Sequence, residues 1–125
     1  AGCGPVHALS YPLGGGYHIP HGEANQLVFA DTFCLYREKS PGGRMRELEK
    51  LLAETLDVSA SRSLEALFAL VDQIHPRKPL RDYGIKAEEL PVFATRVMKE
   101  QQRLLSNSYV PFTVSELAGI YQAAY

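Results

Sequence analysis

Apolar residues recur every three or four positions along much of the chain. Between residues 43 and 56 they alternate with arginine, glutamate and lysine, which predicts a half-buried amphipathic helix. Its apolar stripe consists of Met45, Leu48, Leu51, Leu52 and Leu56. Over residues 21–38 the apolar positions cover more than one helical face, so this stretch is predicted to be a helix in the middle of a bundle.

Three further helices are predicted downstream. A stripe from Leu64 to Ile74 stops at Pro76 and Pro79, and Ser59 or Ser61 can cap its start. The next stripe contains Pro91 in its first turn, where the missing N–H is harmless; its apolar residues are Leu90, Phe93, Val97 and Leu104. The last helix opens with the capping box at residues 113–116 and continues through Leu117, Ile120, Tyr121 and Ala124.

The first helix is expected to be short. Residues 6–13 are small, apolar or aromatic, and the run reaches Pro12 and then Gly14–Gly16, which predicts a helix that stops and a flexible turn that follows. No stretch alternates apolar and polar residues as a strand does. The predicted fold is therefore an all-α helical bundle of about six helices, forming one domain over residues 1–125.

Composition narrows the function classes. The chain has 46% apolar and 22% charged residues and a formal net charge of −1, which is typical of a globular fold and disfavours nucleic acid as a partner. No apolar run is long enough to span a bilayer, and no signal peptide is recognisable, so we expect a cytoplasmic protein without a membrane partner. Cys3 and Cys34 form no CxxC pair and are interpreted as reduced thiols.

Two of the four histidines are candidates for a shared site. A turn after Leu13 would bring His21, at the start of the next helix, back toward the face that bears His7. Solvated or hydrogen-bonded imidazoles remain the alternative for both, and His75 beside Pro76 suits a helix end. Asp31 lies about 15 Å along the helix from His21. Any further metal ligands are therefore expected outside this chain.

The segment from Gly4 to Asn25, GPVHALSYPLGGGYHIPHGEAN, resembles the C-terminal metal-binding signature of the iron-containing (group III) alcohol dehydrogenases. Residues 78–84 and 102–111 and the pair Ile120-Tyr121 are similar to the tail of that family, most of all to its 4-hydroxybutyrate dehydrogenase branch. The resemblance thus covers the whole chain. It implies an all-helical C-terminal domain whose N-terminal nucleotide-binding domain, with an aspartate and a further histidine ligand, lies upstream.

The same resemblance assigns roles to four residues. His7 and His21, fourteen positions apart as in the family, are implied to be metal ligands. Tyr11 stands where many members have a histidine that faces the nicotinamide, so it is expected to be a catalytic or nicotinamide-proximal residue. His18 is assigned to the rim of the pocket. No residue of this chain is identified as binding the nicotinamide cofactor.

The implied chemistry is reversible oxidation of a primary alcohol to an aldehyde, with hydride passing to NAD or NADP. Iron(II) is the expected metal, and zinc would accept the same ligands. The complete protein, with the N-terminal domain restored, is expected to act on a small alcohol or aldehyde as a homo-oligomer. This fragment alone is expected to be inactive. The chain begins at Ala1 without methionine, which is interpreted as a cut end. The alternative is a separate non-enzymatic helical module that binds a partner or a metal through its histidines.

Overall fold

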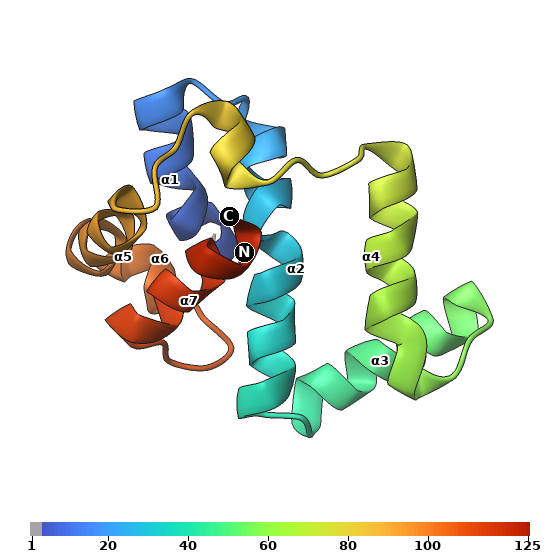
Figure 1. Ribbon diagram of the computed structural model, residues 1–125. Coiled ribbons are helices and arrows are strands. Elements are labelled where there is room, and N and C mark those ends of the chain that lie inside the picture. Colours follow the sequence, from blue (N-terminus) through green and yellow to red (C-terminus); the bar gives the residue numbers. More distant parts are fainter. Residues whose placement is uncertain (1–3) are drawn as a thin grey trace. The chain divides into compact units, whose positions relative to one another are not determined.

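The computed structural model describes residues 4–125, and this range is all-helical, without a strand, as predicted (Figure 1). Seven α-helices and two 3₁₀ turns follow one another along it. In chain order they are α1 (Pro5–Tyr17), α2 (His21–Lys39), α3 (Gly43–Leu56), η1 (Ala60–Arg62), α4 (Ser63–Ile74), η2 (Leu80–Tyr83), α5 (Glu89–Glu100), α6 (Gln102–Leu105) and α7 (Val114–Ala124). None of these helices is both long and apolar enough to cross a membrane.

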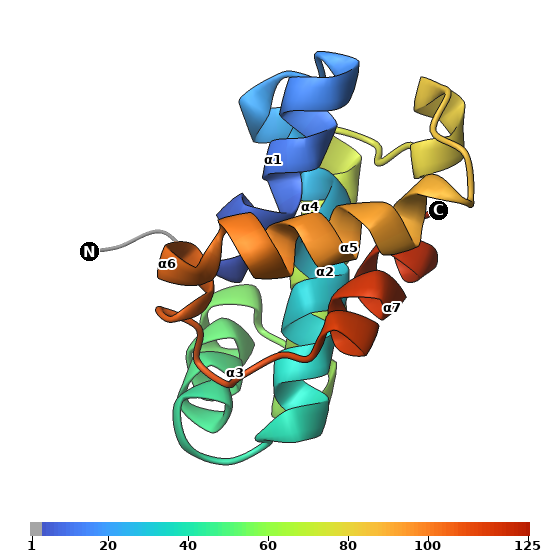
Figure 2. The ribbon, with the colours of Figure 1, turned by 90° about the vertical axis from the view of Figure 1, so that its left-hand side faces the viewer.

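The helices form two compact units, and the division falls within α2, after Phe33. The first unit contains residues up to Phe33 together with Lys78–Tyr125. In it α1 packs against α5 and α6, and α5 also packs against α7. Figure 2 shows α5 lying across α1, with α6 following at its end. The apolar side chains at the centre of this unit include Leu9, Leu13, Leu90, Val97, Leu117 and Tyr121.

Tyr121 links α7, the last helix of the first unit, to α1. Its ring is fully buried and meets the ring of Phe93 edge to face at 5.7 Å between centroids. Its hydroxyl donates a 2.5 Å hydrogen bond to the backbone carbonyl of Leu9. That carbonyl belongs to α1 and Phe93 belongs to α5, so Tyr121 contacts α1 through a hydrogen bond and α5 through apolar packing.

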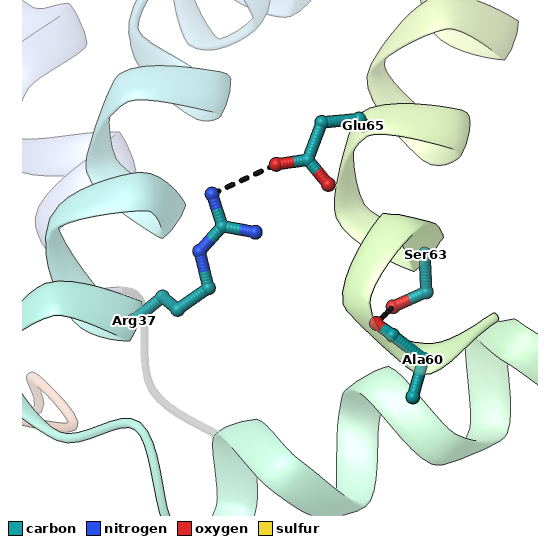
Figure 3. A network of polar contacts seen from close by, with 4 residues as sticks. All are labelled: Arg37, Ala60, Ser63 and Glu65. Carbon is teal, nitrogen blue, oxygen red and sulfur yellow. Dashed lines mark hydrogen bonds and ion pairs between the residues drawn. The ribbon is translucent and has the colours of Figure 1, made fainter.

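The second unit, Cys34–Arg77, contains the end of α2 and the α3–α4 pair. Arg37 forms a 2.8 Å ion pair with Glu65 on α4, and the Ser63 hydroxyl donates to the carbonyl of Ala60 at 2.8 Å (Figure 3). The hydrogen bond from Arg37 lowers the pKa of Glu65. Since the Glu65 side chain is 55% exposed, this pair contributes at most about 1 kcal/mol.

The prediction of a turn at Gly14–Gly16 is wrong, because these residues belong to α1, which continues to Tyr17. The helix passes through Pro12, a residue that costs about 3 kcal/mol in a helix interior. Burial of Leu9 and Leu13 on this helix offsets that cost, at roughly 1.5–3 kcal/mol for each side chain. The chain reverses instead at His18, which has the left-handed φ of 55°.

Other boundaries also differ from the expected ones. The stripe from Leu90 to Leu104 is not one helix, because α5 ends at Glu100 and a separate short helix, α6, follows. The side-chain amide of Gln102 donates a 2.5 Å hydrogen bond to the backbone carbonyl of Met98. Neither Ser59 nor Ser61 caps α4; a 3₁₀ turn precedes that helix instead. Pro91 lies in the first turn of α5, and the capping box at Thr113 is present, both as predicted. Cys34 is a free thiol, whereas Cys3 lies outside the described residues.

Candidate functional site

His7 and His21 come together at the junction of α1 and α2. Their ring centroids are 5.2 Å apart, and the ring planes are inclined by 48°. His7 lies in the first turns of α1, and His21 is the first residue of α2. The reversal at His18 and Pro20 therefore brings two imidazoles from different helices to one place, although it occurs later in the chain than the sequence suggested.

The spacing of this pair suits a shared metal ion. Imidazole nitrogens bind first-row metals at roughly 2.0–2.1 Å, which places the centroids of two rings on one ion about 5 Å apart. His21 is exposed and His7 is half-buried, so both rings are accessible from outside this chain. Imidazole nitrogen is a good ligand for iron and for zinc. The two side chains thus fit two positions of a metal coordination shell.

The described residues offer no complete metal site. Between residues 4 and 125 there is no group of three or more histidine, cysteine, aspartate or glutamate side chains that could hold an ion. Glu23, two residues from His21, has its Oε1 engaged by the Tyr83 hydroxyl at 2.6 Å. A site that uses His7 and His21 therefore needs ligands other than the side chains of residues 4–125.

Asn25 contacts His21 from the next turn of α2. Its Nδ2 lies 3.3 Å from Nε2 of the imidazole, which restricts the rotation of the ring. The other amide atom, Oδ1, is buried and has no hydrogen-bond partner among the described residues. The sequence analysis did not single out this side chain, although its position four residues after His21 is the signal that could have done so.

Tyr11 and His18 occupy different places relative to the histidine pair. Tyr11 follows His7 by one helical turn on α1, and its side chain is 52% exposed. No hydrogen bond engages its hydroxyl in the part of the chain that the structure describes. His18 is exposed at the end of α1, and its left-handed backbone forms the bend before Pro20.

Two tyrosine–glutamate contacts hold the segments around the pair. The Tyr17 hydroxyl hydrogen-bonds to the carboxylate of Glu89 on α5, and the Tyr83 hydroxyl donates to Glu23 on α2. The bond to Glu89 raises the pKa of Tyr17. Burial, with the bond to Glu23, raises the pKa of Tyr83 to about 12. Both phenols therefore stay protonated and remain donors at neutral pH.

This geometry lies within a chain that matches the C-terminal model of the Fe-containing alcohol dehydrogenase family over residues 1–125. The chain belongs to this family. Its helical fold is that of the C-terminal domain, as the resemblance implied.

Curated relatives refine the comparison. The chain is 49% identical to 4-hydroxybutyrate dehydrogenase of Clostridium kluyveri, over 100% of the chain and 34% of that protein. It is 35% identical to long-chain-alcohol dehydrogenase 1 of Geobacillus thermodenitrificans, over 100% of the chain and 32% of that protein. The chain thus spans about a third of the length of these relatives.

Solved structures agree with this assignment. A 1,3-propanediol oxidoreductase superposes with a TM-score of 0.81 at 26% identity, covering 98% of this chain and 32% of that one. An archaeal alcohol dehydrogenase from a Red Sea brine pool, ADH/D1, has a TM-score of 0.84 with the same coverage. At 20% identity the second structure supports the fold alone.

Proposed function

We propose that the complete protein containing this chain is a metal-dependent, NAD(P)-linked alcohol dehydrogenase that interconverts 4-hydroxybutyrate and succinate semialdehyde. The observation that carries the proposal is the pairing of His7 and His21 at 5.2 Å in a member of this family. The 49% identity to a 4-hydroxybutyrate dehydrogenase supports the choice of substrate. This chain supplies the all-helical C-terminal domain, and an N-terminal domain supplies the nucleotide site and the remaining ligands.

In this proposal His7 and His21 bind the metal as neutral imidazoles, with iron(II) as the expected ion and zinc as the alternative. The bound metal supplies Lewis-acid chemistry to the substrate oxygen, and the nicotinamide supplies hydride transfer. Asn25 limits the orientations of the His21 ring through its contact with Nε2.

Tyr11 has a separate role in the proposed site. It lies on the same helical face as His7, with an exposed phenol that no described residue engages. We assign it to the wall of the cleft beside the nicotinamide, where its hydroxyl donates a hydrogen bond. His18, exposed at the end of α1, forms part of the rim. A homo-oligomeric state and a cytoplasmic location complete the proposal.

Metal content and activity of the complete protein test this function together. We expect stoichiometric iron or zinc by elemental analysis and NAD(P)-dependent oxidation of 4-hydroxybutyrate. His7→Ala and His21→Ala should each remove the metal and the activity. His75→Ala is the matched control, because His75 caps the end of α4 in the second unit, and this variant should retain both. Full metal occupancy in either of the first two variants would reassign the ligands.

A further inference from the structure

A pocket of about 200 Å³ lies between α1 and α5 in the first unit. From α1, Tyr11 and Gly15 line it, one turn apart; from α5 and the residue after it come Arg96, Glu100 and Gln101. Val97 and Pro12 supply apolar walls. The pocket is therefore a small space of mixed polar and apolar lining, with one cationic side chain and with the tyrosine assigned to the cleft in its wall.

The spacing along α1 between His7 and Tyr11, which lines this pocket, suits a short substrate. Tyr11 lies one helical turn beyond His7, and four residues of α-helix advance about 6 Å. The hydroxyl and carboxylate of an extended four-carbon hydroxy acid are separated by five bonds, or roughly 6 Å at the advance of an extended chain. A substrate whose hydroxyl is held near His7 can therefore reach the edge of the pocket with its carboxylate.

Arg96 is available to receive that carboxylate. Its closest contact with an acidic group is the 3.7 Å approach of Nε to Oε2 of Glu100, which is longer than a hydrogen bond. The two side chains are 51% and 56% exposed, so this ion pair contributes little. The guanidinium makes no hydrogen bond to any residue between 4 and 125. The planar guanidinium can form two parallel hydrogen bonds to the two oxygens of one carboxylate.

Glu100 also lines the pocket and would repel an anion that approached it directly. Its carboxylate lies on the Nε side of Arg96, which leaves the terminal nitrogens of the guanidinium for the substrate. The Gln101 amide adds a neutral donor on the same wall.

We propose that the Arg96 pocket binds the carboxylate end of the substrate and so selects ω-hydroxy acids and ω-semialdehydes over uncharged alcohols. The proposal rests on the proposed function, because it assumes that the reacting hydroxyl lies beside His7 and His21. It adds a specificity-determining residue on α5, a helix that contributes neither histidine.

Steady-state kinetics of the complete, metal-loaded protein with two substrates test the proposal. We expect Arg96→Met to raise the KM for 4-hydroxybutyrate about thirtyfold or more, while kcat/KM for 1,4-butanediol changes less than threefold. Arg96→Lys, which retains the charge but loses the planar guanidinium, should have an intermediate effect on 4-hydroxybutyrate. Lys99→Gln is the matched control, because it removes one positive charge from the same helix outside this pocket and should leave both substrates unaffected.

Calorimetric titration with butyrate separates failure of this proposal from failure of the proposed function. Wild-type protein should bind butyrate, and Arg96→Met should weaken that binding at least tenfold whether or not the protein oxidises alcohols. Equal butyrate affinity in the two proteins would overturn the assignment of Arg96. Equal losses for 4-hydroxybutyrate and 1,4-butanediol would overturn it as well, since they would show a structural role. Absence of oxidation of both substrates by wild-type protein, with butyrate binding still dependent on Arg96, would refute only the proposed activity.

Discussion

The phenol of Tyr83 donates a 2.6 Å hydrogen bond to Oε1 of Glu23, which lies 60 positions earlier in the chain. Glu23 is in the first turn of α2, two residues after His21, and Tyr83 ends η2. The contact therefore ties a distant 3₁₀ turn to the helix start that presents one of the two histidines.

Removal of this phenol should loosen both segments. We expect Tyr83→Phe to lower the free energy of local opening at η2 and the start of α2 by about 1–2 kcal/mol, because a hydrogen bond to a carboxylate is lost and Glu23 keeps an unpaired oxygen. Hydrogen exchange of the backbone amides in these segments measures the effect. Glu23→Gln, which retains an acceptor, should have the smaller effect; unchanged exchange in Tyr83→Phe would show that the bond does not hold these segments.

Alkaline pH should destabilise the folded protein through its phenols. Burial and Glu23 raise the pKa of Tyr83 to about 12; the bond to Glu89 raises the pKa of Tyr17, and burial raises that of Tyr121. An unfolded tyrosine loses its proton near pH 10, so the stability that these groups contribute is complete below pH 10 and is lost as the pH rises toward 12.

Unfolding midpoints measured between pH 9 and 12 check this expectation. The midpoint should fall with pH, and Tyr83→Phe should make the fall shallower because one of the shifted groups is absent. An absorbance titration of the native protein in which all seven tyrosines ionise together near pH 10 would contradict it.

The capping box of α7 should contribute measurably to stability. The Thr113 hydroxyl accepts a 3.1 Å hydrogen bond from the Glu116 amide, and the Glu116 carboxylate accepts a 2.8 Å bond from the Thr113 amide. We expect Thr113→Ala to destabilise the helix by about 1 kcal/mol, as measured by exchange of the α7 amides. Thr55→Ala serves as the control, because that hydroxyl only bonds to the Leu51 carbonyl one turn back within α3; an equal loss in both variants would exclude a capping effect.

Tyr11→Phe should have a modest effect on catalysis in the complete enzyme. A phenol is a weaker general acid–base group at neutral pH than an imidazole, so we expect hydride transfer to slow by roughly tenfold or less. Pre-steady-state measurement of hydride transfer reports this step directly. A loss of about a thousandfold would mean that Tyr11 carries the proton.

Local patterns predicted much of the helical structure. The stripe over residues 43–56 coincides with α3, and the Thr113 motif opens α7, because spacing and capping act over one or two turns of chain. The sequence also singled out His7 and His21, and the structure brings their rings together. The sequence-based prediction misplaced the turn between them. Glycine disfavours a helix by its intrinsic propensity, but it is tolerated in a helix whose apolar face is buried.

The remaining features depend on residues that are far apart in the chain. The Tyr17–Glu89 and Tyr83–Glu23 contacts join positions 72 and 60 residues apart, and no short-range period marks either. The pocket at Arg96 exists because α5 packs across α1, which brings an arginine of one helix beside Tyr11 of the other. The sequence by itself determined most of the helices and the residue types that can bind a metal, through interactions within a few turns. Only tertiary packing decided which side chains share a site, because that depends on how helices bury their apolar faces against each other.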